Sequence, residues 1–328
     1  MKFGDIIRQP LPVATFTFLV VVIVAFVRAW VTQRFAGEIP AVSAPLGYYT
    51  AAFRLSWPLL SAAASIVMLF VAGFLIGRSS VRAELYATRC FLAMPLFGVV
   101  SCGVLLSSDY LTQSLTLLLL ALASRNYYNS FHRHYCFDRM FRGSLYVGLI
   151  PLLYAPGAGL LLLIPLVVLL FRRTLREVAV AVAGLLLPAL TLCYVNWAAG
   201  GEFLAQVAEP GSAFIAGTPL SLFLSTPVQN LVLPGAVFLL DLTALLFFLS
   251  DIYALGTKPR LIFIFNISAL LLTAAALCGP AATPATVALA AVPSAVLLPF
   301  MFVRIHRAIA LPLYLLLLAS AVISAVLQ

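Results

Sequence analysis

The sequence predicts an all-α protein, a polytopic bundle of transmembrane helices that forms a single domain over residues 1–328. Hydrophobic residues make up 64% of the chain and charged residues only 9%, which is more apolar surface than a soluble fold of this size can bury. The apolar residues form long runs that charged residues or Pro/Gly clusters separate. A bilayer is crossed by about 20 helical residues, so we expect about eleven membrane segments.

Most of these predicted segments are uninterrupted apolar runs. The first follows Lys2 and Arg8 and is too long for the core of a signal peptide, so we expect it to be retained as a span. The loops 31–54 and 199–230 are the two sizeable connections on the predicted outer side. The runs cover residues 11–30, 55–77, 90–107, 110–124, 178–198, 231–250, 261–279, 285–303 and 308–327.

Residues 143–171 form a longer run, which the Pro/Gly-rich segment 155–159 interrupts. This run is either one kinked span or a hairpin of two short helices. The hairpin places Arg172, Arg173 and Arg176 on the same side as most other basic residues, and cytoplasmic loops carry such an excess of basic residues. The basic residues therefore favour the hairpin, with the N-terminus in the cytoplasm and the C-terminus outside.

Each arm of this hairpin rises only about 18 Å, because a helix advances 1.5 Å per residue. The turn near Tyr154 should therefore lie within the membrane. Non-helical backbone at that depth either lines a water-filled cavity or is packed between neighbouring helices. We accordingly expect either an outward-facing cavity at Tyr154 or a packed turn.

The basic loop 125–142 accounts for part of the net charge of +9 and contains several tyrosines and phenylalanines. Such a loop can bind single-stranded nucleic acid, but on a membrane surface it more often forms an interfacial helix against anionic lipid. We therefore expect membrane lipid and no nucleic acid as a partner. His132, His134 and Cys136 match no common zinc spacing, and the five cysteines form no CxxC pair, so neither a metal nor a cofactor is expected.

The few acidic residues on the predicted outer side are the candidates for chemistry. Glu38 and Asp109 are the candidate catalytic groups, since a carboxylate can serve as a general base. Arg34 and Arg54 lie in the same outer region and could bind a phosphate group. For each acid the alternative is a solvated surface charge, which is the favoured interpretation for the two remaining outer acids, Glu202 and Glu209.

Asp241 is a carboxylate near the middle of the predicted span 231–250. A carboxylate at that depth usually faces the protein interior, either as part of a proton or ion relay or as a hydrogen-bonding partner of another helix. No basic residue lies at a matching depth. Hydrogen bonding, to a residue such as Asn266 on the next span, is therefore favoured over proton-coupled transport.

One stretch, residues 109–188, also carries a family resemblance. It contains an acidic residue at the outer end of a helix and a basic loop, followed by GSLYVGLIPLLYAPG, LLLLIPLVVLLFRR and a G-x-x-x-P at Gly184 to Pro188. This stretch closely resembles an uncharacterised family of bacterial integral membrane proteins known only as a domain of unknown function. The resemblance implies a location in the bacterial cytoplasmic (inner) membrane.

The same stretch more distantly resembles the membrane module of GT-C glycosyltransferases, which take a sugar from a polyprenyl-phosphate carrier on the outer side of the membrane. In that superfamily the first outer loop carries the essential acid, often paired, and a later helix carries a second acid at its outer end. By position, Glu38 and Asp109 correspond to these acids. The sequence departs from the pattern in having a single Glu in that loop, and Tyr154 where those enzymes commonly have Lys.

Three functions remain open on these grounds. The first is a GT-C-like protein that handles a polyprenyl-phosphate-linked envelope precursor, with Arg34, Arg54 and Tyr154 at the lipid phosphate, Glu38 as the base and Asp109 orienting the acceptor. The second is a transporter or flippase that uses the same cavity without catalysis. The third is a scaffold subunit whose apolar faces bind other membrane proteins.

Overall fold

The computed structural model of the protein describes residues 9–31, 44–103, 109–131, 135–215, 218, 220–226 and 228–327. Every regular element in these ranges is a helix, which confirms the predicted all-α class. Five of the described helices have segments long and apolar enough to cross a membrane, as a multi-pass membrane protein requires. They are α1 (Leu11–Val31), α3 (Pro58–Arg82), α8 (Leu175–Ala198), α11 (Val228–Asp251) and α12 (Thr257–Leu277).

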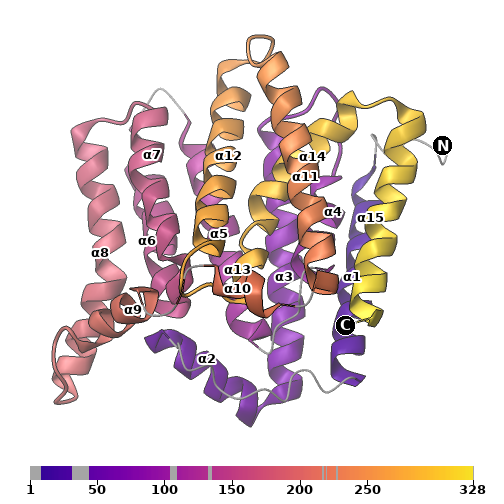
Figure 1. Ribbon diagram of the computed structural model, residues 1–328. Coiled ribbons are helices and arrows are strands. Elements are labelled where there is room, and N and C mark those ends of the chain that lie inside the picture. Colours follow the sequence, from indigo (N-terminus) through magenta and orange to yellow (C-terminus); the bar gives the residue numbers. More distant parts are fainter. Residues whose placement is uncertain are drawn as a thin grey trace.

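The remaining helices complete the bundle and cover one of its ends. The short helices α2, α9, α10 and α13 lie toward the lower end in Figure 1, where the long helices begin or finish. The bounds are α2 (Pro45–Ser56), α4 (Ala93–Gly103), α5 (Tyr110–Ser130), α6 (Phe137–Leu153), the 3₁₀ helix η2 (Ala155–Leu162), α7 (Leu163–Leu170), α9 (Ala205–Ile215), α10 (Ser221–Ser225), α13 (Pro284–Ala288), α14 (Ala291–Arg304) and α15 (Arg307–Leu327).

The predicted runs correspond to helices, with two differences in how they are divided. The run 55–77 begins in one helix and continues in another, because Pro58 occupies the first turn of α3 and proline disfavours helical backbone in the residue before it. The run 285–303 is divided between α13 and α14. Part of the predicted outer loop 31–54 is also helical, since α2 occupies its second half.

The basic segment 125–142 is mostly helical, but its helical residues belong to α5 and α6 of the bundle and do not form the separate interfacial helix that we expected. Helix α5 continues to Ser130 and α6 begins at Phe137, so only a short connection remains. The physical reason is packing: Tyr127 and Tyr128 are buried, and both rings contact the ring of Phe265 in α12. These aromatic side chains therefore stabilise the bundle and do not face a membrane surface.

The chain turns back at Tyr154, as the hairpin interpretation predicts. Tyr154 has an extended backbone that ends α6, and η2 and α7 follow. Arg173, just after α7, donates a hydrogen bond to the carbonyl of Ser130 at the end of α5. Glu177 in α8 accepts one from the backbone N–H of Cys136, directly before α6. The two ends of the hairpin therefore lie at the same end of the bundle.

Two glycines bring α6 and α8 into direct backbone contact. A Cβ atom on Gly148 would lie 2.6 Å from the carbonyl oxygen of Leu185, and one on Gly184 would lie 2.5 Å from that of Phe141. Small residues allow helices to approach this closely, which is how membrane helices gain packing energy. Gly148 in GSLYVGLIPLLYAPG and Gly184 in the G-x-x-x-P therefore have a packing role.

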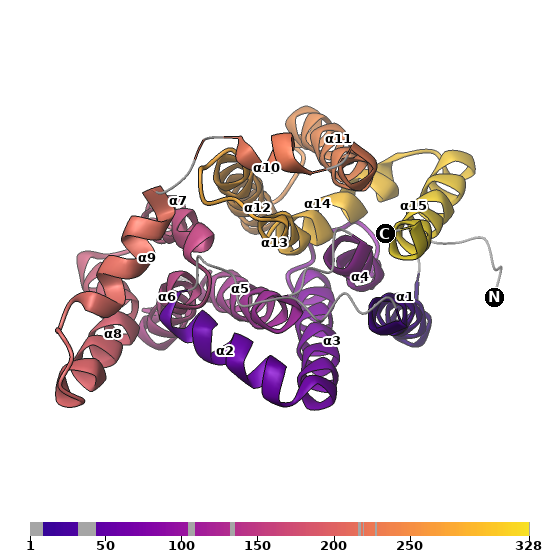
Figure 2. The ribbon, with the colours of Figure 1, turned by 60° about the horizontal axis from the view of Figure 1, so that its bottom comes forward.

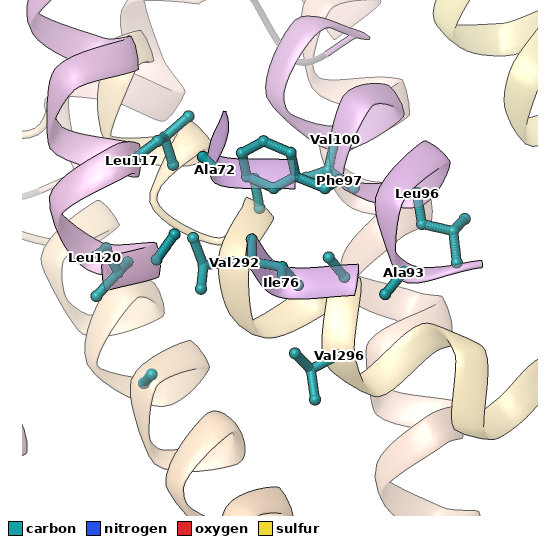
Figure 3. Close-up of a cluster of buried hydrophobic side chains, with 14 of the residues drawn as sticks. Ala72, Ile76, Ala93, Leu96, Phe97, Val100, Leu117, Leu120, Val292 and Val296 are labelled. Carbon is teal, nitrogen blue, oxygen red and sulfur yellow. The ribbon is translucent and has the colours of Figure 1, made fainter. Parts of the chain in front are cut away.

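The centre of the bundle is a layer of aliphatic and aromatic side chains from α3, α4, α5 and α14 (Figure 3). Helix α4 is buried on all sides, as expected for a helix at the centre of a bundle. In Figure 3 its residue Phe97 lies among Ala72 of α3, Leu117 of α5 and Val292 of α14. This packing fixes the positions of α3, which begins shortly after Arg54, and of α5, which begins directly after Asp109.

Candidate functional site

Three of the residues singled out in the sequence come together at the end of the bundle that α2 covers. Arg54 lies in the last turn of α2, Asp109 directly precedes α5, and Tyr154 directly follows α6. Arg54 Nη2 lies 4.0 Å from Asp109 Oδ1. Asp109 and Tyr154 line the same cavity. We refer to these three residues as the outer cluster, after the outer side of the membrane on which the sequence predicts this end of the bundle.

Helix α2 directs Arg54 into the bundle. It lies across the ends of α5 and α6 (Figure 2) and packs against both helices. A Cβ atom on Gly47 would lie 2.5 Å from the carbonyl oxygen of Leu153, so only glycine lets α2 dock this closely on α6. Thr50 in α2 shares a 2.6 Å hydrogen bond with Thr112 in α5. As a result, the side chain of Arg54 is only 2% exposed.

The opposite face of α2 is aromatic and exposed. Tyr48, Tyr49 and Phe53 point outward, and Trp57 follows directly after the helix. Aromatic side chains of this kind concentrate at the boundary between membrane and water. Helix α2 thus has the two faces of a helix that lies along a membrane surface, with its buried face against the outer cluster.

Asp109 lies in an environment that favours its neutral form. Burial raises the pKa of its carboxyl group above the ordinary value, while the nearby guanidinium of Arg54 acts in the opposite direction and offsets part of this effect. At 4.0 Å the two side chains form an ion pair and not a direct hydrogen bond. A carboxyl group with a raised pKa, close to a buried cation, is suited to exchange a proton or to orient a hydroxyl group.

The hydroxyl of Tyr154 is held by two threonines of a neighbouring helix. It forms hydrogen bonds with Thr283 Oγ1 and, at 2.5 Å, with Thr286 Oγ1. These threonines also form the capping box that begins α13, in which the backbone N–H of Thr283 donates to Thr286 Oγ1 at 3.1 Å. Tyr154 therefore ties the turn of the hairpin to the segment between α12 and α14.

The cavity between Asp109 and Tyr154 is small. Its volume of about 10 Å³ is roughly the space that one water molecule needs. In the described arrangement it is too small for a sugar or a lipid headgroup, so such a ligand would fit between Asp109 and Tyr154 only after the helices that line the cavity moved apart. The cavity is lined by Asp109, Thr112, Gln113, Thr116, Leu117, Tyr154, Ala285, Ala288 and Leu289.

Arg34 and Glu38 fall outside the described residues. Glu202 is exposed, in agreement with its interpretation as a surface charge.

Asp241 is buried and faces the protein interior, as expected for a carboxylate in a span. Its hydrogen-bond donor is Ser294 of α14, however, and not the expected Asn266. Asn266 instead accepts a 2.7 Å hydrogen bond from the Tyr128 hydroxyl and donates to the carbonyl of Ile262. The physical reason is that α11 packs against α14, which the order of spans along the chain does not reveal.

Several polar residues next to the outer cluster were not predicted. Thr112 and Thr116 are one helical turn apart and both are buried, and Thr283 and Thr286 have the spacing of a capping box. The sequence signal that could have identified these threonines is their position as polar residues on one face of an otherwise apolar helix. In the described ranges, no group of three or more His, Cys, Asp or Glu side chains is placed to hold a metal ion.

Comparison with known proteins adds no relative to this description. A scan against protein-family models found no match, and neither did searches of curated proteins and of solved structures. The chain is thus described by its own features: an all-helical fold with five candidate membrane spans in the described ranges, and a polar cluster at the end that α2 covers.

Proposed function

We propose that this integral membrane protein handles a lipid-linked precursor of the bacterial cell envelope at the outer cluster, in an architecture like that of GT-C glycosyltransferases. In this proposal the chain has about eleven membrane segments, and the outer cluster faces the external side of the inner membrane. The observation that supports it is the convergence of Arg54, Asp109 and Tyr154 from three separate helix ends. The substrate is a sugar or similar group on a polyprenyl phosphate.

The cluster supplies the groups that this chemistry needs. A guanidinium matches the geometry of phosphate oxygens, so Arg54 would stabilise the charge that the polyprenyl phosphate gains as it leaves. Asp109 would orient the acceptor hydroxyl, and Glu38 would accept its proton as the acceptor oxygen bonds to the transferred group. Arg34 would join Arg54 at the phosphate. The helices that line the cavity would have to move apart for the substrate to enter, because the cavity is small.

A scaffold role is the second candidate, and two observations favour it. The cavity has room for only about one water molecule, and the hydroxyl of Tyr154 is already bound by Thr283 and Thr286. In that case the outer cluster holds α2 in place and partner proteins bind to apolar helix faces. A flippase that uses the same site without catalysis is a third candidate, for which Asp241 would be the proton-accepting group.

The test is complementation of a deletion strain with variants of the full chain. The proposal predicts loss of function in Asp109→Asn and Arg54→Gln, with normal amounts of protein in the membrane. Asp138→Asn is a matched control, because Asp138 is an exposed acid at the start of α6, remote from the outer cluster. Full activity of both cluster variants would reject the proposal. If a partner protein then co-purified in mild detergent, the scaffold role would be supported, whereas loss only in Asp241→Asn would support transport.

A further inference from the structure

A second cavity lies between α3 and α5, at the end of the bundle opposite to the outer cluster. Its volume is about 80 Å³, considerably larger than that of the cavity beside Asp109. It adjoins the C-terminal turns of both helices, whereas Asp109 precedes the first turn of α5. The lining residues are Phe74, Leu75, Arg78, Ser79, Arg82, Arg125 and Asn129. We refer to this cavity as the arginine pocket.

Helix geometry explains why these residues share one cavity. Side chains four residues apart lie on the same face of an α-helix. Phe74, Arg78 and Arg82 have this spacing along α3, and Arg125 and Asn129 have it along α5. Because α3 and α5 pack against each other, the two faces meet, and the side chains of three exposed arginines line the cavity there.

The positive charge of the arginine pocket is not neutralised by the protein. No carboxylate lines the cavity, and among the described residues none lies within 4.0 Å of the three guanidinium groups. Asp138, at the same end of the bundle, is paired with Arg142 at 2.8 Å. Arg139 is a further cation at this end of the bundle, and it donates a hydrogen bond to the backbone carbonyl of Asn129. A bound anion would remove the repulsion between these cations.

The chemistry of the lining favours a phosphate group. Guanidinium groups bind phosphate oxygens through paired hydrogen bonds, and the side chains of Ser79 and Asn129 offer further donors. Phe74 and Leu75, one turn before Arg78, add two apolar side chains to the lining. The pocket therefore combines cations and donors with an apolar surface.

An exposed apolar stripe leads away from the pocket along α3. Val71 is 38% exposed and Val67 is 60% exposed, one and two turns before Leu75 on this apolar, candidate membrane-spanning helix. We propose that Arg78, Arg82 and Arg125 bind the phosphate group of an anionic lipid, whose acyl chain lies along Val71 and Val67. This site is separate from the outer cluster and does not depend on the function proposed there.

The test is a lipid titration of the full chain in mild detergent, followed by native mass spectrometry. Phosphatidylglycerol is the anionic probe, phosphatidylcholine is the zwitterionic comparison, and inorganic phosphate is the soluble competitor. We expect Arg78→Gln with Arg125→Gln to weaken phosphatidylglycerol binding at least about tenfold, as charge-assisted hydrogen bonds are lost. The matched control is Arg172→Gln with Arg176→Gln, which removes the same charge from positions near the same end that are also exposed but do not line the pocket.

Each outcome decides the proposal. The proposal is supported if phosphatidylglycerol binding is lost in the pocket variant and retained in the control variant. An equal loss of phosphatidylglycerol binding in both double variants would mean non-specific attraction to the basic surface and would overturn the proposal. Displacement of the lipid by equimolar inorganic phosphate would assign the pocket to a soluble anion. If the glutamine variant is misfolded, Arg78→Lys with Arg125→Lys keeps the charge but loses the paired hydrogen bonds; unchanged binding in that variant would also overturn the assignment.

Discussion

The ion pair between Arg173 and Glu177 should be one of the strongest single contributions to the stability of this fold. Glu177 accepts hydrogen bonds from the backbone N–H groups of Cys136 and Thr174, at 3.0 and 3.1 Å. It also accepts from the Thr174 hydroxyl and from Arg173 Nη1, both at 3.1 Å. The Arg173 and Glu177 side chains are only 5% and 4% exposed. The pair therefore joins α5, α6 and α7 to the start of α8.

Replacing Glu177 with Ala would leave the guanidinium of Arg173 buried without its counter-charge. Removing one partner of a buried ion pair typically costs 3–5 kcal/mol, so we expect Glu177→Ala to lower the free energy of unfolding by about 3–5 kcal/mol. The chain offers a matched control in Asp138→Ala. Asp138 also pairs with an arginine one helical turn away, Arg142. The side chains of Asp138 and Arg142 are 68% and 58% exposed, and exposed pairs contribute about 0–1 kcal/mol.

The assay is reversible unfolding of the purified chain in mixed micelles, followed by far-ultraviolet circular dichroism as the fraction of denaturing detergent increases. Wild type and the two variants are compared under the same conditions. The expected order of stability is wild type, then Asp138→Ala close behind it, with Glu177→Ala well below both. If Glu177→Ala and Asp138→Ala differed by less than about 1 kcal/mol, the reasoning from burial would be refuted.

Three further predictions concern packing, the buried carboxylate and pH. Gly148→Ala should destabilise the fold by about 1–3 kcal/mol, because its Cβ would overlap the backbone of α8, whereas Gly235→Ala has open space and should be neutral or slightly stabilising in the same unfolding assay. Asp241→Ala should cost about 0.6–1.7 kcal/mol through its lost hydrogen bond, and a gain in stability would contradict this. The pKa of Asp109 is raised in the folded protein, so the contribution of Asp109 to stability is full below the ordinary pKa of 3.8 and is lost as pH rises through the raised pKa. Asp109→Asn should abolish this pH dependence in unfolding curves measured at several pH values. An unchanged pH dependence in Asp109→Asn would contradict the prediction.

The features that the sequence predicted correctly are those that depend on local pattern. Apolar runs predict the helices, and the Pro/Gly segment after Tyr154 predicts the break between α6 and α7. Helix α2 was not predicted, because its hydrophobicity is modest and its stability comes from docking on α5 and α6. In the same way, Tyr127 and Tyr128 were expected at a membrane surface, whereas their burial depends on contact with α12.

The outer cluster was predicted in its parts but not as a unit. Arg54, Asp109 and Tyr154 were singled out because charged residues are rare outside the basic side and because the hairpin turn is unusual. Their convergence depends on α2 lying across α5 and α6, which no sequence spacing indicates. The predicted hydrogen bond between Asp241 and Asn266 was also wrong. Sequence spacing does not indicate that α11 packs against α14, whose Ser294 donates to Asp241.

The most direct test of the proposed site is the affinity of the full chain for a polyprenyl phosphate, measured in nanodiscs by photo-crosslinking. The titration is best made with Arg78→Gln and Arg125→Gln already present, so that the arginine pocket does not contribute. If Arg54 binds the phosphate, adding Arg54→Gln should weaken binding at least about tenfold, while adding Asp138→Asn should leave it unchanged. Equal affinity in the Arg54→Gln protein, with its circular dichroism intact, would contradict a phosphate-binding role for the outer cluster.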